Sequence, residues 1–124
     1  MTAKRELISV VDDDESVRES LPDLLKELGF EVQAFSSAEA FLAAGDLDTT
    51  RCLILDIAMP GMSGPDLQRE LNLRGIRIPI IFITANSNQI DRSRLLERGA
   101  VDCLYKPFSE KALLSALDAA LRAD

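Results

Sequence analysis

Short apolar runs alternate regularly with amphipathic helical patterns along this chain. Parallel strands need long crossover connections, which helices usually provide, so this alternation predicts an α/β, doubly wound (βα)5 sheet with helices on both faces. A chain of 124 residues suffices for one core, so we expect a single domain over residues 1–124 with no output domain. The predicted strands are Leu7 to Asp12, Phe30 to Phe35, Cys52 to Ile57, Ile78 to Thr84 and Val101 to Tyr105.

Capping residues and apolar spacing place helices after these strands. Asp14 is expected to cap the first helix, and Ser36 with Glu39 has the spacing of a capping box for the second. Pro65 suits the first position of the third helix, and Ser109 can cap the last. The fourth helix is predicted from Gln89 to Arg98, and the inward stripe of the last from Leu113, Leu114, Leu117 and Leu121.

Composition excludes several classes of function. The chain has no histidine, which removes imidazole bases and histidine-rich zinc sites, and its net charge of −7 opposes direct contact with nucleic acid. No apolar stretch approaches the length of a membrane span, and no secretory signal precedes the acidic residues 12–14, so we expect a cytoplasmic protein. Cys52 and Cys103 lie in apolar runs and are predicted to be buried free thiols.

Polar residues follow the predicted strands at the points where they end. Asp12 and Asp13 follow the first strand, Asp56 the third, Thr84 the fourth and Lys106 the fifth. Ligands of doubly wound sheets bind at this carboxyl edge. Two like charges ~4 Å apart cost on the order of 4 kcal/mol at an effective dielectric near 20, so clustered carboxylates favour a bound cation. Mg²⁺ is predicted, because only hard oxygen ligands are offered.

These side chains suit transfer of a phosphoryl group. A carboxylate near a cation can attack phosphorus, which predicts Asp56 as the nucleophile, while Lys106 neutralises the transferring oxygens and Thr84 donates its hydroxyl. Asp13 would hold the metal directly, and Asp12 through water or by orienting its neighbour. Each residue alone has an ordinary structural explanation, and the hypothesis depends on their joint position at strand ends.

Four stretches resemble the response-regulator receiver family, most closely receivers of the FixJ type. They are VVDDDESVR (residues 10–18), LILDIAMPGMSG (53–64), IIFITA (80–85) and GAVDCLYKPF (99–108). The spacing agrees as well, with 43 residues from Asp13 to Asp56, 28 from Asp56 to Thr84 and 22 from Thr84 to Lys106. The resemblance implies a flavodoxin-like, five-stranded parallel sheet of order 2-1-3-4-5.

The resemblance also implies roles for individual residues. Asp56 would be the phosphoacceptor, Asp12 and Asp13 the acidic pair, and the backbone carbonyl of Ala58 a further Mg²⁺ ligand. Lys106 would pair with the phosphoryl group, and the Lys106–Pro107 bond is expected to be cis.

Partners are implied in the same way. The phosphoryl donor would be a sensor histidine kinase or a phosphotransfer protein. Self-association would use the face formed by the fourth helix, fifth strand and fifth helix. The expected activity is signalling with slow autodephosphorylation, in the absence of membrane or direct nucleic-acid contact.

One position departs from the family pattern. Three residues before Lys106 the family usually has Tyr or Phe, and this chain has Cys103. Thr84 would be the switch hydroxyl, but a cysteine cannot fill the space of the aromatic ring that usually moves with it. Tyr105 lies two residues further along the same strand and therefore on the same side, so it is a candidate for that role. The alternative is that Tyr105 is an ordinary exposed residue on an edge strand.

Two other functions fit part of the pattern. A phosphatase of the haloacid-dehalogenase kind uses an Asp nucleophile with Mg²⁺, but it needs a second Asp two residues later as general acid, and this chain has Ala58. A receiver-like interaction module that is never phosphorylated would share the fold without the chemistry. Steady turnover of a phosphomonoester would favour the phosphatase, and failure to label with a small phosphodonor such as acetyl phosphate would favour the interaction module.

Overall fold

Five parallel strands form one sheet in the order β2-β1-β3-β4-β5 in the computed structural model, which describes residues 6–85 and 92–122. The strands are β1 (Leu7–Val11), β2 (Glu31–Phe35), β3 (Thr50–Asp56), β4 (Ile80–Thr84) and β5 (Asp102–Tyr105). The helices are α1 (Glu15–Glu27), α2 (Ala38–Ala44), α3 (Gly64–Leu73), α4 (Arg92–Glu97) and α5 (Glu110–Arg122). The predicted fold class and strand order are both confirmed.

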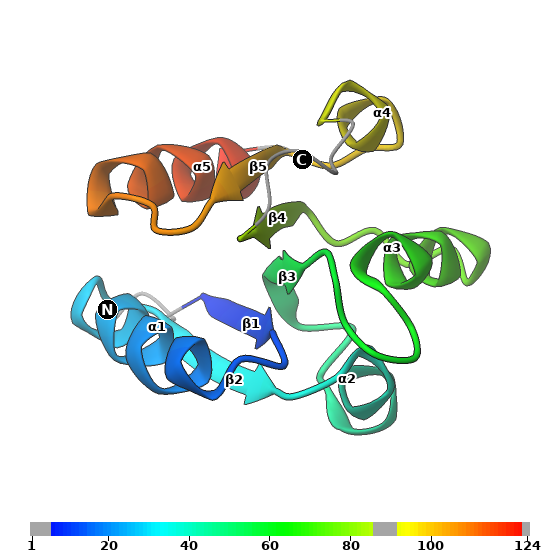
Figure 1. Cartoon of the computed structure of the whole chain (residues 1–124), viewed down its shortest axis with the longest axis horizontal. Helices are drawn as coiled ribbons and strands as arrows, with labels where there is room; N and C mark the ends of the chain where they lie inside the picture. Colours follow the sequence, from blue (N-terminus) through cyan, green and yellow to red (C-terminus); the bar gives the residue numbers. More distant parts are fainter. Residues whose placement is uncertain (1–5, 86–91, 123–124) are drawn as a thin grey trace, which may run out of the picture.

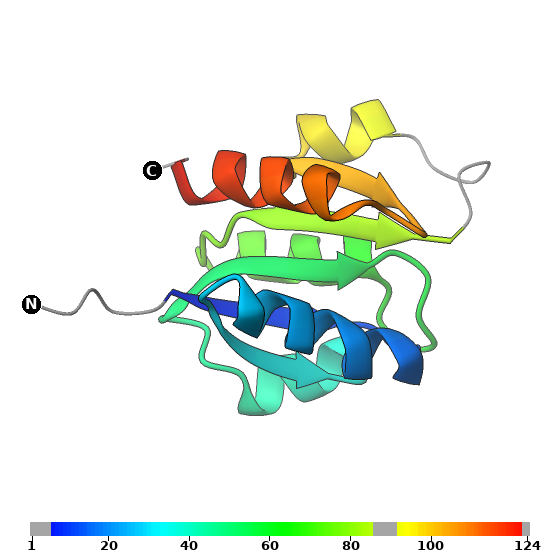
Figure 2. The same cartoon turned by 90° about the vertical axis from the view of Figure 1, so that its left-hand side faces the viewer.

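The sheet separates two layers of helices (Figures 1 and 2). One apolar cluster contains buried side chains of α1 and α5, and the other contains buried side chains of α2, α3 and α4. Strand β3 contributes to both, because Leu53 and Leu55 point to one side while Cys52 and Ile54 point to the other. The central strands β3 and β4 are therefore buried on both faces, as their unbroken apolar sequences predict.

Several element ends differ from the sequence-based prediction. Strand β4 begins at Ile80 rather than Ile78, because Pro79 has no N–H to donate to the sheet. The last helix is capped by Ser109 as predicted, but Leu114 is 40% exposed and does not belong to the inward stripe. Ala116 and Ala120 are buried in its place. Residues 89–91 of the predicted fourth helix lie outside the described residues.

The predicted start of the second helix is wrong by one residue. The cap is Ser37, whose Oγ accepts from the Ala40 N–H at 3.0 Å, and not Ser36. Glu39 is consequently too early for a capping box, and its carboxylate accepts from the Met62 N–H at 3.1 Å instead. This hydrogen bond joins α2 to the loop after β3.

The third helix begins with a cap that the sequence analysis missed. Ser63 Oγ accepts from the Asp66 N–H at 3.2 Å, and the Asp66 carboxylate accepts from the Ser63 N–H at 3.1 Å. Pro65 therefore follows Gly64 inside the helix and is not its first residue. Asp14 caps α1 as predicted, and the Lys106–Pro107 bond is cis.

Gly64 lies where the first turn of α3 packs directly on the end of β3. A Cβ at this position would lie 2.3 Å from the Asp56 carbonyl oxygen and 3.1 Å from the Ile57 Cα. Both are backbone atoms that cannot rotate away. Residue 64 is therefore restricted to glycine by close packing against the residue that ends β3.

We predict that Gly64→Ala lowers the free energy of unfolding by about 2 to 4 kcal/mol, because overpacking against backbone forces a local shift. Gly75→Ala is the control. Gly75 has a φ of +72° and open space around it, so its substitution should cost only about 1 kcal/mol. Urea denaturation measures both values, and equal losses would contradict the packing argument.

Candidate functional site

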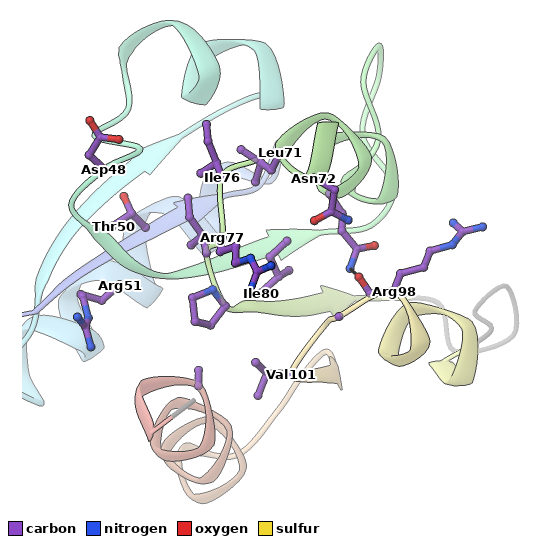
Figure 3. Close-up of a pocket in the computed structure, with 15 residues that line it drawn as sticks. Asp48, Thr50, Arg51, Leu71, Asn72, Ile76, Arg77, Ile80, Arg98 and Val101 are labelled. Carbon is purple, nitrogen blue, oxygen red and sulfur yellow. Dashed lines mark hydrogen bonds between the residues drawn. The ribbon is translucent and has the colours of Figure 1, made fainter. Parts of the chain in front are cut away.

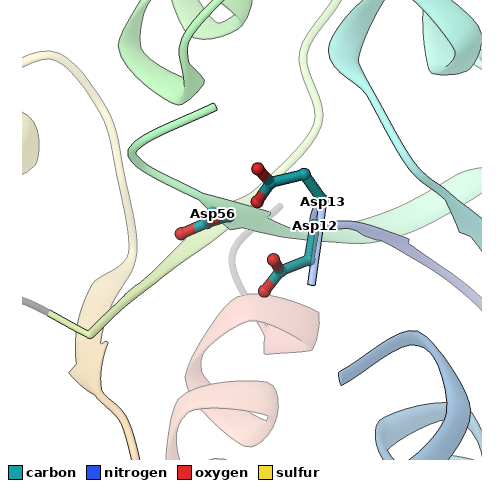
Figure 4. A group of neighbouring side chains, drawn as sticks. All are labelled: Asp12, Asp13 and Asp56. Atoms are coloured by element: carbon teal, nitrogen blue, oxygen red, sulfur yellow. The ribbon is translucent and has the colours of Figure 1, made fainter. Parts of the chain in front are cut away.

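Three carboxylates meet at the carboxyl edge of the sheet. Strand β1 lies beside β3, so Asp12 and Asp13, which follow β1, lie next to Asp56 at the end of β3. Carboxylate oxygens of the three residues all lie within 4.8 Å of one another (Figure 4). This convergence was expected if the first and third strands are neighbours, and β1 does pair with β3.

Asp12 is fully buried and held from several sides. Its Oδ1 accepts from the Asp14 N–H at 2.9 Å, and its Oδ2 accepts from Lys106 Nζ at 2.8 Å. Arg18 donates from Nη1 to the Asp12 backbone carbonyl at 3.0 Å. The sequence analysis did not identify Arg18, although it lies at the end of the first matching stretch. These contacts leave little freedom for the Asp12 side chain.

Lys106 also faces Asp56, with 3.9 Å between Nζ and Oδ1. Burial by itself would lower the pKa of Lys106, but the hydrogen bond to Asp12 and the charges of Asp56 and Asp12 outweigh it, and the pKa is raised. Lys106 therefore remains a cation at neutral pH. It lies between the buried acid and the predicted nucleophile.

The environment of Asp56 disfavours its charged form. Burial, followed by the negative charge of Asp12, raises the pKa of Asp56 to about 7, and Lys106 opposes the change only in part. Asp13, the third acid, is exposed. Without a cation, the site therefore concentrates more negative charge than the nearby lysine compensates.

The donor set fits a hard divalent cation. The three acids offer only oxygen ligands, one of them exposed, which suits a metal that keeps several waters, as Mg²⁺ does. Ala58 is exposed in the loop that follows β3, near Asp56 in sequence. The hydrogen bond from the Met62 N–H to Glu39 fastens this same loop to α2. Asp12, Asp13 and Asp56 could thus bind a metal ion. A cation would offset the crowded negative charge that contributes to the raised pKa of Asp56.

Thr84 ends β4, the strand next to β3, and β5 lies one strand further along the sheet. Thr84 is buried at the end of β4, and its carbonyl accepts from the Lys106 N–H at 2.7 Å. In the sheet register Thr84 pairs with Tyr105, which is 41% exposed. Cys103 is buried in the cluster that contains α3 and α4. The chain thus places Thr84, Tyr105 and Lys106 next to one another.

Both cysteines are free and buried, as predicted. Burial raises the pKa of the Cys52 thiol to about 12, and burial is also the largest cause of the raised pKa of Cys103. Both thiols are therefore protonated at neutral pH, which makes them poor nucleophiles.

Comparison with known proteins identifies the class of protein to which this chain belongs. A family model described as the response regulator receiver domain matches residues 8–118. The chain therefore belongs to the response regulator receiver domain family, the signalling domains of two-component systems.

Individual members of this family resemble the chain in sequence and in structure. The chain is 46% identical over 118 residues to nodulation protein W of Bradyrhizobium diazoefficiens, covering 95% of this chain and 52% of the relative. It is 40% identical to transcriptional regulatory protein FixJ of Azorhizobium caulinodans, covering 92% and 54%. The structure of response regulator StyR matches with a TM-score of 0.89 at 44% identity, covering 96% of this chain and 60% of that one. The expected likeness to the FixJ type is confirmed.

These comparisons also bear on the expected domain organisation and on the expected absence of nucleic acid as a partner. The chain spans about half the length of the curated relatives it matches. Because FixJ is named a transcriptional regulatory protein, the expectation that nucleic acid is not a partner is unsupported, and the charge of −7 bears only on direct contact by these residues. Within residues 6–85 and 92–122, no helix has both the length and the apolar content needed to cross a membrane.

We predict that the metal-free protein loses stability as the pH rises. Asp56 has a pKa of about 7 when folded, against an ordinary value of 3.8. The folded state therefore binds more protons between these values, and stability present below pH ~4 is lost as the pH rises through ~7, by about 2 to 4 kcal/mol.

Urea denaturation in EDTA at pH 5 and pH 8 measures this loss, and Asp56→Asn serves as the comparison. The amide does not titrate, so the variant should show a smaller difference between the two pH values and higher stability at pH 8. Equal pH dependence in both proteins would contradict the proposed cause.

Proposed function

We propose that this chain is a phosphorylation-dependent switch that accepts a phosphoryl group on Asp56 from a sensor histidine kinase or a phosphotransfer protein. The observation that carries the proposal is the position of Asp56, which lies within reach of two other acids and 3.9 Å from the Lys106 ammonium. Asp12, Asp13, Asp56 and the Ala58 carbonyl would hold Mg²⁺. Asp56 and Lys106 would act on the phosphoryl group directly.

Transfer requires Asp56 to act as a nucleophile. One of its carboxylate oxygens forms a bond to phosphorus while the bond from phosphorus to the donor's leaving atom breaks. Because the pKa of Asp56 is raised to about 7 in the metal-free site, part of the protein carries a protonated and unreactive Asp56 at neutral pH. When bound, Mg²⁺ favours the ionised carboxylate and neutralises charge on the phosphoryl oxygens.

Lys106 and Thr84 would respond to the phosphoryl group. Lys106 already lies between Asp12 and Asp56, so a phosphoryl group on Asp56 would offer its ammonium a further anionic partner. Thr84 would donate its hydroxyl to another phosphoryl oxygen. The two residues are linked through the hydrogen bond between the Thr84 carbonyl and the Lys106 N–H.

The signalling role is favoured over phosphatase turnover. A haloacid-dehalogenase mechanism needs a general acid two residues after the nucleophile, and Ala58 has no proton to give. Loss of the phosphoryl group would therefore be slow. We further propose that residues 1–124 form one receiver domain that acts in the cytoplasm, with self-association through the face of α4, β5 and α5, where Leu96, Tyr105 and Leu114 are exposed.

We predict that acetyl phosphate with Mg²⁺ labels the protein and that Asp56→Asn abolishes labelling, because an amide keeps the shape but is not a nucleophile. Intact mass spectrometry measures the added phosphoryl group. Asp23→Asn is the control, since Asp23 is exposed on α1, away from the site. Full labelling of the Asp56 variant would refute the assignment, and no labelling of the unaltered chain would favour an unphosphorylated interaction module.

Signal output would involve Tyr105 together with Thr84. Cys103 is buried and too small to replace an aromatic switch residue, whereas Tyr105 is partly exposed, pairs with Thr84 and precedes Lys106. A pull on the Thr84 hydroxyl would change the space beside Tyr105. The ring would then shift between two states and reshape the surface of α4 and β5.

Beryllium trifluoride, a phosphoryl mimic, should therefore change the Tyr105 side-chain conformation. We predict that Tyr105→Ala weakens the dependence of self-association or kinase binding on phosphorylation while Asp56 is still labelled. Leu73→Ala, which removes an exposed side chain at the end of α3, outside this face, is the control. One unchanged Tyr105 conformation with and without the mimic would mean that the signal takes another route.

A further inference from the structure

A cleft lies at the edge of the sheet opposite the acid cluster (Figure 3). It has a volume of about 810 Å³ and is bounded by the amino ends of β3 and β4, the last turns of α3 and the end of α5. None of the proposed phosphorylation residues lines it. Its size falls within the range of about 300 to 1,000 Å³ that is usual for small-molecule sites.

The inner wall of the cleft is apolar. Leu71 of α3, Ile78 and Ile80 are buried side chains that line it, and Ile76 and Val101 extend the wall toward solvent. These branched side chains come from α3, the segment before β4, the first residue of β4 and the segment before β5. Such a surface favours a flat or compact apolar group.

The rim of the cleft is positive, in contrast to the chain as a whole. Three arginines line it with one carboxylate, Asp48, on a protein whose net charge is −7. Figure 3 shows Arg77 in the middle of the lining residues, with Arg51 and Arg98 toward its ends. Arg51 forms an ion pair with Glu6, with 3.9 Å between Nη2 and Oε1. Arg77, in contrast, makes no ion pair with any residue that the structure describes. An exposed, uncompensated guanidinium beside an apolar wall favours an anionic ligand.

Gln68 adds a hydrogen-bond acceptor. It lines the cleft and is only 3% exposed, and its Nε2 donates to the Arg98 carbonyl at 3.3 Å. Its Oε1 is buried and has no hydrogen-bond partner among the described residues. A buried acceptor left unpaired costs about 1 to 3 kcal/mol, so it favours a ligand that brings a donor.

We infer that this cleft binds a small organic anion with an apolar ring body and one N–H or O–H donor. The ring would lie on the isoleucine wall, the anionic group would pair with Arg77, and the donor would satisfy Gln68 Oε1. This inference does not rest on the proposed phosphorylation, because the two sites share no residue.

Three related compounds test the three features separately. Indole-3-acetate has the ring, the carboxylate and an N–H donor; indole-3-acetamide lacks the charge; 1-naphthaleneacetate lacks the donor. Titration of each into ¹⁵N-labelled protein, followed by amide chemical shifts, should give saturable changes at residues lining the cleft. Indole-3-acetate should bind most tightly, by about fivefold over either analogue, the effect of one hydrogen bond or exposed ion pair.

Two variants assign the contacts. Arg77→Gln removes the exposed cation and should weaken indole-3-acetate about fivefold without affecting indole-3-acetamide. Gln68→Met keeps the volume but removes the acceptor, so it should weaken indole-3-acetate and leave 1-naphthaleneacetate unchanged. Arg74→Gln is the control, because Arg74 follows α3, does not line the cleft, and pairs with Glu70.

The inference is overturned if the shifts fall outside the cleft, if the three compounds bind equally, or if Arg77→Gln and Arg74→Gln behave alike. Shifts at the cleft that depend on protein concentration without any compound would instead identify a second copy of the chain as its occupant. Asp56→Asn should bind indole-3-acetate like the unaltered protein, so failure of the phosphorylation proposal leaves this test valid.

Discussion

The ion pair between Lys106 and Asp12 links the ends of β5 and β1 at the carboxyl edge of the sheet. It joins residues 94 positions apart, and it places a lysine that follows β5 against an acid that follows β1. Asp12 is fully buried, and removing one partner from a buried pair typically costs about 3 to 5 kcal/mol. The position of Lys106 beside Asp56, and the linked Thr84 carbonyl, depend on this contact. A stabilising interaction and a reactive centre therefore share the same side chains.

Much of the fold could be predicted because its signals are local. Continuous apolar runs indicate buried strands, and capping residues such as Asp14 and Ser109 mark helix starts. Strand order is different, since it depends on contacts between distant segments, and here it came only from the family resemblance. The predicted start of α2 was wrong because Ser36 and Ser37 are competing cap candidates. The predicted start of β4 was wrong because Pro79 interrupts the apolar run and cannot donate a hydrogen bond.

The site was predictable for a related reason. In a parallel sheet the carboxyl ends of all strands share one edge, so polar residues at strand ends meet whatever the helices do. Arg18 was missed and Glu39 was assigned to the wrong contact, because their roles depend on where α1 and α2 pack, which no local pattern specifies. The cleft lined by Arg77 and Gln68 was missed too, since its residues come from five separate segments and carry no common motif.

The division of the core into two clusters affects how the sequence can vary. Among the described residues, the buried side chains of α1 and α5 belong to one apolar cluster and those of α2, α3 and α4 to the other, with the sheet between them. Substitutions such as Leu25→Val and Leu71→Val should therefore change stability additively, because separated sites without common partners rarely couple. Each face can accumulate volume changes that its own neighbours compensate. Strand β3, which contributes side chains to both clusters, is constrained from both sides at once.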